Sequence, residues 1–132
     1  MRYGIGDEMR TIKFRGKRVD NGEWVYGDLI HYNEQFVVNV YDTEVGCYAY
    51  QVPIIHETVG QFTGLYDKNG TEIYEGDILS TEMRDVNFEM IWVQETASFM
   101  FKSTESSNVW EIDKSINKLE VIGNIHDNKG ML

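Results

Sequence analysis

The stretch TGLYDKNGTEIYEGDIL, residues 63–79, has the pattern of two short strands joined by a tight turn and followed by a third strand. Its centre, DKNG at residues 67–70, supplies Asp, Asn and Gly, which favour turns because they bond their own backbone or tolerate positive φ. β-Branched and aliphatic residues stand on both sides, as strands prefer. Gly76 permits a sharp bend into the last strand, and we expect Asp77 to accept hydrogen bonds from neighbouring backbone amides.

The same pattern occurs upstream, where NGEWVYGDLI at residues 21–30 matches NGTEIYEGDIL at residues 69–79 with one inserted residue. Two explanations are open, a duplicated hairpin or two separate uses of one turn sequence. Asp28 and Asp77 occupy equivalent places in the two copies. Two such carboxylates raise the idea of an acid/base pair, but turn capping at two separate locations explains each of them, and we predict this structural role.

Strand-forming residues dominate the rest of the chain. Asp-Asn-Gly at residues 20–22 predicts a first hairpin, and Pro53 fits a strand end or an edge strand. Strands are expected at residues 12–19, 23–32, 35–41, 47–52, 58–66, 71–74, 77–81, 89–94, 98–103 and 118–125. Hydrophobic residues recur at helical spacing only in one place, at Val109, Ile112 and Ile116. We therefore predict a mainly β fold, either a small bent antiparallel sheet or an SH3-like barrel, with one short helix near residues 107–117.

Three blocks taken together resemble the YopX family of phage and prophage proteins: IKFRG at residues 12–16, the stretch at residues 63–79, and EVIGNIHDN at residues 120–128. The resemblance runs from about Met9 to Leu132. It implies a small, mostly β protein in a phage context, and it implies no catalytic residues because the family has no assigned activity. The chain ends in KGML where the family usually has Pro-Glu-Leu-Leu, and a Gly there disfavours a closing helical turn.

Length and composition indicate one domain. A chain of 132 residues with 42% hydrophobic content can bury one core, which we place at residues 9–132. Residues 1–8 read as an N-terminal extension that need not be ordered, and we hypothesise that translation begins at Met9. The sequence shows neither a membrane-spanning apolar run nor a secretory signal, which predicts a cytoplasmic location in the host bacterium. The single cysteine, Cys47, has strand-forming neighbours and is predicted to be an inert thiol.

The charge is large and unevenly distributed. The formal net charge is −10, yet the first 18 residues carry six Lys or Arg, and residues 19–67 carry none. A segment as acidic as residues 19–67 repels phosphate backbones. Nucleic-acid-binding proteins normally carry an excess of positive charge instead. The negative charge can serve solubility, offer an acidic face to a basic host protein, or receive the basic segment of a second subunit.

Patterns that carry chemistry are absent from the sequence. The three histidines, His31, His56 and His126, are widely spaced and form neither a helical pair nor a Cys/His cluster of zinc type. Residues 67–70 resemble the middle of a calcium loop, but that alignment puts Leu65 and Gly76 where ligands belong. There is no phosphate loop and no nucleophile beside a base. We therefore predict that the protein is not an enzyme and uses no cofactor or metal, and the sequence defines no binding residues.

Three hypotheses follow. The first is a non-enzymatic phage or prophage accessory protein that acts by protein–protein binding or self-assembly, with homo-oligomers expected because sheet edges need cover. The second is an acidic inhibitor that occupies the basic nucleic-acid-binding site of a host protein, which requires one shared face for Asp20, Glu23, Asp28, Glu34, Asp42 and Glu44. The third is a nucleic-acid binder that uses the basic N-terminal segment, Arg10, Lys13, Arg15, Lys17 and Arg18.

Overall fold

The structure is a computed structural model that describes residues 9–42, 44, 46–82 and 85–128, apart from the side chains at 42 and 47–49. The described strands form two antiparallel sheets. The six-stranded sheet has the order β4-β3-β2-β1-β5-β6. Its strands are β1 (Phe14–Lys17), β2 (Trp24–Tyr32), β3 (Gln35–Asp42), β4 (Cys47–Ile54), β5 (Gly60–Tyr66) and β6 (Glu72–Tyr74).

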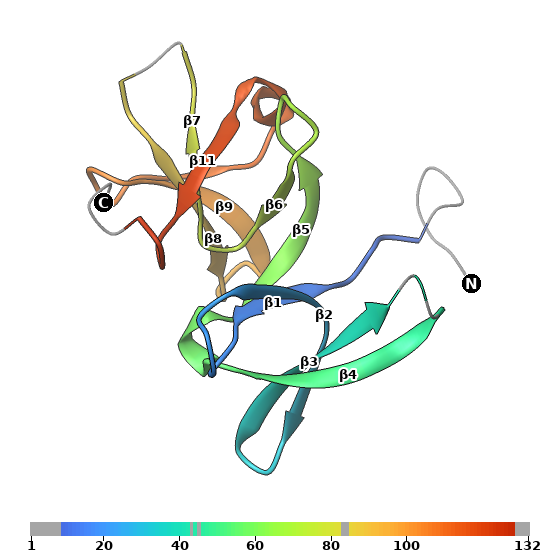
Figure 1. The fold of residues 1–132 in the computed structure, drawn as a ribbon. Coiled ribbons are helices and arrows are strands. Elements are labelled where there is room, and N and C mark those ends of the chain that lie inside the picture. Colours follow the sequence, from blue (N-terminus) through green and yellow to red (C-terminus); the bar gives the residue numbers. More distant parts are fainter. Residues whose placement is uncertain (1–8, 43, 45, 83–84, 129–132) are drawn as a thin grey trace.

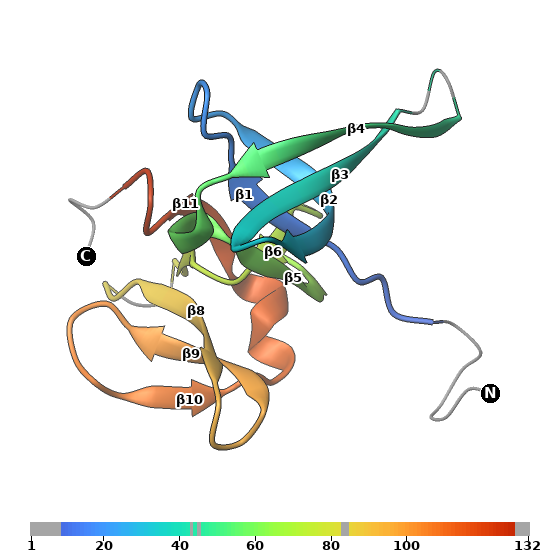
Figure 2. The same ribbon diagram turned by 90° about the horizontal axis from the view of Figure 1, so that it is seen from below.

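The five-stranded sheet has the order β10-β9-β8-β7-β11. Its strands are β7 (Asp77–Ser80), β8 (Phe88–Val93), β9 (Ser98–Ser103), β10 (Val109–Glu111) and β11 (Glu120–Asn124). Two 3-10 helices complete the fold, η1 (His56–Thr58) and η2 (Lys114–Lys118). In Figures 1 and 2, β5 and β6 lie between the β1–β4 part of the molecule and the five-stranded sheet. No helix in the described part of the chain has the length and apolar character needed to cross a membrane.

The hairpin predicted around residues 20–22 is confirmed. β1 pairs with β2 around the Asp-Asn-Gly turn, where Gly22 has a φ of 75° and Asn21 Oδ1 accepts a bond from the backbone amide of Glu23. β3 pairs with β4, and Pro53 lies near the end of β4, an outer strand in the sheet order. The connection between β2 and β3 is short. It is a tight turn in which Asn33 and Glu34 both have positive φ.

Asp67 organises the turn at the centre of residues 63–79. Its buried carboxylate accepts hydrogen bonds from the backbone amides of Asn69 at 2.8 Å and Thr71 at 2.9 Å. The other oxygen accepts a bond of 2.9 Å from the amide of Val121, which ties the turn to β11. These amide bonds keep the pKa of Asp67 below its ordinary value although burial opposes the shift. The residue that looked like part of a calcium loop is therefore a structural anchor.

Gly76 and Asp77 make the bend that leads into β7. Gly76 has a φ of 91°, a conformation that residues other than glycine rarely adopt. Asp77 accepts a hydrogen bond of 2.7 Å from the backbone amide of Tyr74, as predicted for this carboxylate. Asp28, its counterpart in the upstream copy, is exposed on β2 in the other sheet. The two carboxylates thus occupy separate locations and do not form an acid/base pair.

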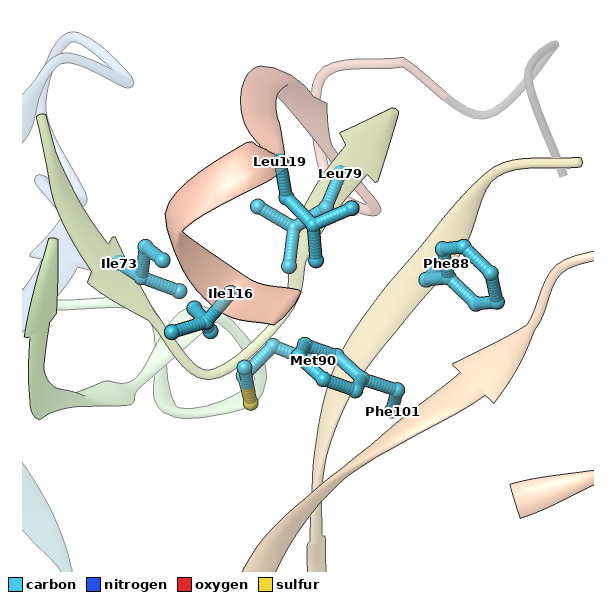
Figure 3. Packing of buried hydrophobic residues seen from close by; sticks show 7 residues of the cluster. All are labelled: Ile73, Leu79, Phe88, Met90, Phe101, Ile116 and Leu119. Carbon is cyan, nitrogen blue, oxygen red and sulfur yellow. The ribbon is translucent and has the colours of Figure 1, made fainter. Parts of the chain in front are cut away.

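The main core lies between the five-stranded sheet and η2. It consists of Ile73, Leu79, Phe88, Met90, Phe101, Ile116 and Leu119, none of which is more than 9% exposed. Figure 3 shows Ile116 and Leu119, from η2 and its end, packed toward side chains of β7, β8 and β9. Alternate residues of β8 and β9 face this core, as the two-residue period of a strand requires.

Two fold predictions need correction. The SH3-like barrel alternative is wrong, because the described strands form two sheets and no closed barrel. The short helix lies at residues 114–118 and is of the 3-10 type. Asp113 caps its start by accepting a bond from the amide of Ser115. The residues expected in its first half, 109–111, form β10 instead. Pairing with β9 and the packing of Trp110 on Phe88 override the helical spacing there.

Candidate functional site

The basic residues of the N-terminal segment are used inside the fold. Lys13, Arg15 and Lys17 share one face of the strand at β1, because alternate residues of a strand point the same way. Each of them pairs with a carboxylate from a different part of the chain: Lys13 with Glu72, Arg15 with Asp77, and Lys17 with Asp127. This row of ion pairs joins β1 to β6, to β7 and to the turn after β11.

Arg15 is the buried member of the row. Its Nη2 donates a hydrogen bond of 2.8 Å to Asp77 Oδ1, and both side chains are less than 10% exposed. The guanidinium lies 4.6 Å from the ring centroid of Trp24 and 4.9 Å from that of Tyr74, so it is held between two aromatic faces. Burial raises the pKa of Asp77, and the charge of Arg15 opposes this shift. This contact connects the two sheets, since β1 and β7 belong to different ones.

Asp127 closes the row at the other end of β1. One carboxylate oxygen pairs with Lys17, and the other accepts a hydrogen bond of 2.8 Å from Trp24 Nε1. The bonds to Lys17 and Trp24 lower the pKa of Asp127 to about 2. The indole of Trp24 also contacts the ring of His126 at 5.8 Å between centroids. Residues 126 and 127, which follow β11, therefore contact the hairpin formed by β1 and β2.

The low pKa of Asp127 predicts a dependence of stability on acid. The folded state favours the ionised carboxylate, so its stabilising contribution is present above the ordinary aspartate pKa of about 4 and is lost as the pH falls toward 2. We expect Asp127→Asn to cost stability at neutral pH and to lose that difference in acid. Urea unfolding of both proteins at neutral pH and near pH 2 measures this. A difference that is equal at both pH values would contradict the assignment.

Few cations of this segment stay free for a phosphate backbone. Arg18 also has a carboxylate partner, because its Nε and Nη2 donate hydrogen bonds of 2.9 Å to the two oxygens of Asp20. Four of the five residues assigned to the nucleic-acid hypothesis are thus paired with carboxylates, and Arg10 is the fifth. A binding site for nucleic acid needs cations that face the solvent, whereas here the charges are neutralised within the chain.

Several acidic residues assigned to the inhibitor hypothesis lie at different strand ends. Asp20 and Glu23 lie at the turn between β1 and β2, whereas Glu34 lies at the opposite end of β2. Asp42 ends β3, at the far end of that strand from Glu34. Figure 1 shows these strand ends at separate corners of the β1–β4 part. The acidic residues therefore spread around the molecule.

The histidines take part in ring contacts. The ring of Phe36 is stacked between those of His31 and His56, each with centroids 4.3 Å apart. His126 lies far along the chain, beside Trp24. Within the described ranges, no three His, Cys, Asp or Glu side chains gather as they would around a metal ion.

A hollow of about 220 Å³ lies beside β8. Its lining includes Glu57, Glu75, Glu89 and His126, together with the indole of Trp92. Burial raises the pKa of Glu75 and that of Glu89, and their mutual repulsion adds to the shift at Glu89. The lining offers no hydroxyl, thiol or amine nucleophile. The polar part of the lining is thus a group of three carboxylates and one imidazole.

A groove along β10 is the best candidate for a binding site. It comprises two hollows, of about 330 Å³ and 360 Å³, that share Phe88 and Trp110. The first continues toward η2 over Phe101 and Leu119, and the second continues toward the loop before β10. Trp110 packs edge-on against Phe88 with ring centroids 5.6 Å apart. We call these two hollows the β10 groove.

The β10 groove has an aromatic floor and a polar rim. Phe88 and Phe101 belong to the core and are nearly buried, whereas Trp110 is 40% exposed. The rim residues are Thr81, Glu105, Ser106, Asn108, Glu111, Asp113, Ser115 and Lys118. An apolar floor with a few polar groups at the rim is typical of ligand-binding sites. The helical prediction for residues 107–117 concealed this site, because it placed Trp110 on a helix.

The fold and the groove together define a small protein of two antiparallel sheets with an apolar groove at a sheet edge. The model of the YopX protein family matches residues 13–132. The chain therefore belongs to the YopX family, as its three sequence blocks suggested. A search of curated proteins finds no match.

Proposed function

We propose that this protein is a non-enzymatic accessory protein of phage or prophage that acts by binding another protein or by self-assembly. The β10 groove is the single observation that carries the proposal, because it combines exposed aromatic surface with the open edge of a sheet. Binding hot spots in protein interfaces are enriched in Trp, and they fill or form apolar pockets. Trp110 fits this role.

The other two hypotheses have less support. A nucleic-acid binder would need the cations of the N-terminal segment, and those of Lys13, Arg15, Lys17 and Arg18 have carboxylate partners. An acidic inhibitor of a basic site would need its carboxylates on one face, whereas Asp20 and Glu23 lie at the opposite end of β2 from Glu34. Protein binding through an apolar groove requires neither arrangement.

Recovery of the tagged protein from host cells tests the proposal. The cells carry the phage or prophage, the extract is divided, and one half is treated with nuclease before purification. We expect a stoichiometric protein partner that survives the nuclease, or a defined homo-oligomer by light scattering. Recovery of a monomer alone, or of partners that disappear with nuclease, would overturn the proposal.

A further inference from the structure

We infer that the β10 groove receives an extended, positively charged segment of a partner protein, which adds a strand to the five-stranded sheet. This inference rests on the proposed function and specifies the chemistry of the partner. Three features carry it: an unpaired strand edge, two adjacent hollows, and a rim with more negative than positive charge.

The edge of β10 can pair with another strand. β10 is the last strand in the sheet order and pairs with β9 through Val109, Trp110 and Glu111. The carbonyl of Asn108 accepts a hydrogen bond from the amide of Ser103, so this carbonyl and, two residues on, the backbone groups of Trp110 point toward β9. The backbone groups of Val109 and Glu111 then point away from the sheet. Figure 2 shows β10 as the outermost strand on this side of the molecule.

The two hollows lie one after the other along β10. One hollow lies toward residues 103–108 and the other toward residues 111–119, with Trp110 and Phe88 common to both. Alternate side chains of an extended segment point to the same face and lie about 7 Å apart. A strand that pairs with β10 can therefore place two such side chains in the two hollows. An α-helix presents its neighbouring side chains at three- and four-residue intervals and offers no backbone groups to the edge.

The charge of the rim indicates a cationic partner. The lining includes Glu105, Glu111 and Asp113 against a single cation, Lys118. The bond from Ser115 to Asp113 lowers the pKa of Asp113, so this carboxylate keeps its charge in mild acid. The whole chain carries −10, which also attracts a basic segment and opposes pairing with a second copy. A cationic extended segment with alternate apolar residues satisfies all these features.

The test uses synthetic peptides and the full-length protein. The probe is a short capped peptide that alternates Arg and Ile, and two controls are a peptide of the same composition with the residues grouped and one with Glu in place of Arg. We expect the alternating peptide to shift the NMR signals of the groove residues and to slow amide exchange at Val109 and Glu111. Added salt should weaken this binding.

Matched variants locate the peptide. Trp110→Ser should weaken binding of the alternating peptide by about tenfold or more. Trp92→Ser is the control, because Trp92 is 41% exposed and packs edge-on against Phe99 much as Trp110 packs against Phe88. Equal binding of all three peptides, or of both variants, would overturn the inference. A nuclease-resistant partner from host cells combined with no peptide binding would overturn this inference alone and leave the proposed function standing.

Discussion

Replacing Arg15 by methionine should lower the free energy of unfolding by about 3–5 kcal/mol, because it leaves a buried carboxylate without its partner. Asp77 is 2% exposed and loses a hydrogen bond of 2.8 Å from the guanidinium. The cation between the rings of Trp24 and Tyr74 disappears as well. Urea unfolding followed by tryptophan fluorescence and by circular dichroism measures the change.

Arg18→Met is the matched control for this prediction. Arg18 also pairs with an aspartate, Asp20, but that pair is exposed, and we expect its loss to leave the unfolding midpoint nearly unchanged. The double variant Arg15→Met with Asp77→Leu should recover part of the lost stability, since no charge is then left buried. Equal effects of Arg15→Met and Arg18→Met would show that the row of ion pairs on β1 does not hold the sheets together.

Leu79→Ala should cost about 2–5 kcal/mol of the free energy of unfolding, because it removes a large side chain from the centre of the core. Leu79 is fully buried on β7 and lies beneath η2 among Ile116 and Leu119. Thermal and urea unfolding of the variant measure the loss. Ile122→Ala on the neighbouring strand β11 is the control, since Ile122 is 36% exposed and should tolerate truncation with a much smaller effect. Similar losses at both positions would place the main core elsewhere.

Local signals in the sequence predict most of the strands. Turns built on Gly22 and on Asp67 have a physical cause within a few residues, namely positive φ and bonds from side chain to backbone. The hairpins around them could therefore be predicted without knowledge of the rest of the fold. The pattern at residues 63–79 indicated both the turn and the capping role of Asp77.

Contacts distant in sequence could not be predicted. The partners of Lys13, Arg15 and Lys17 lie 59 or more residues away, so the segment looked like an exposed basic stretch. The position of Trp110 on β10 could not be predicted either, because it depends on pairing with Phe101 and packing on Phe88. The spacing of the hydrophobic residues around it indicated a helix. The candidate site was therefore missed, because β10 and the segments on either side of it supply most of its lining.

The most direct test of the β10 groove as the binding site compares two tagged variants, Trp110→Ser and Trp92→Ser. Both are recovered from host cells after nuclease treatment. The two tryptophans are equally exposed and lie at different places on the five-stranded sheet. We predict that the partner recovered with the unaltered protein stays with Trp92→Ser and is lost from Trp110→Ser, while both variants remain folded by circular dichroism. A partner that remains bound to folded Trp110→Ser would contradict the assignment of the β10 groove as the binding site.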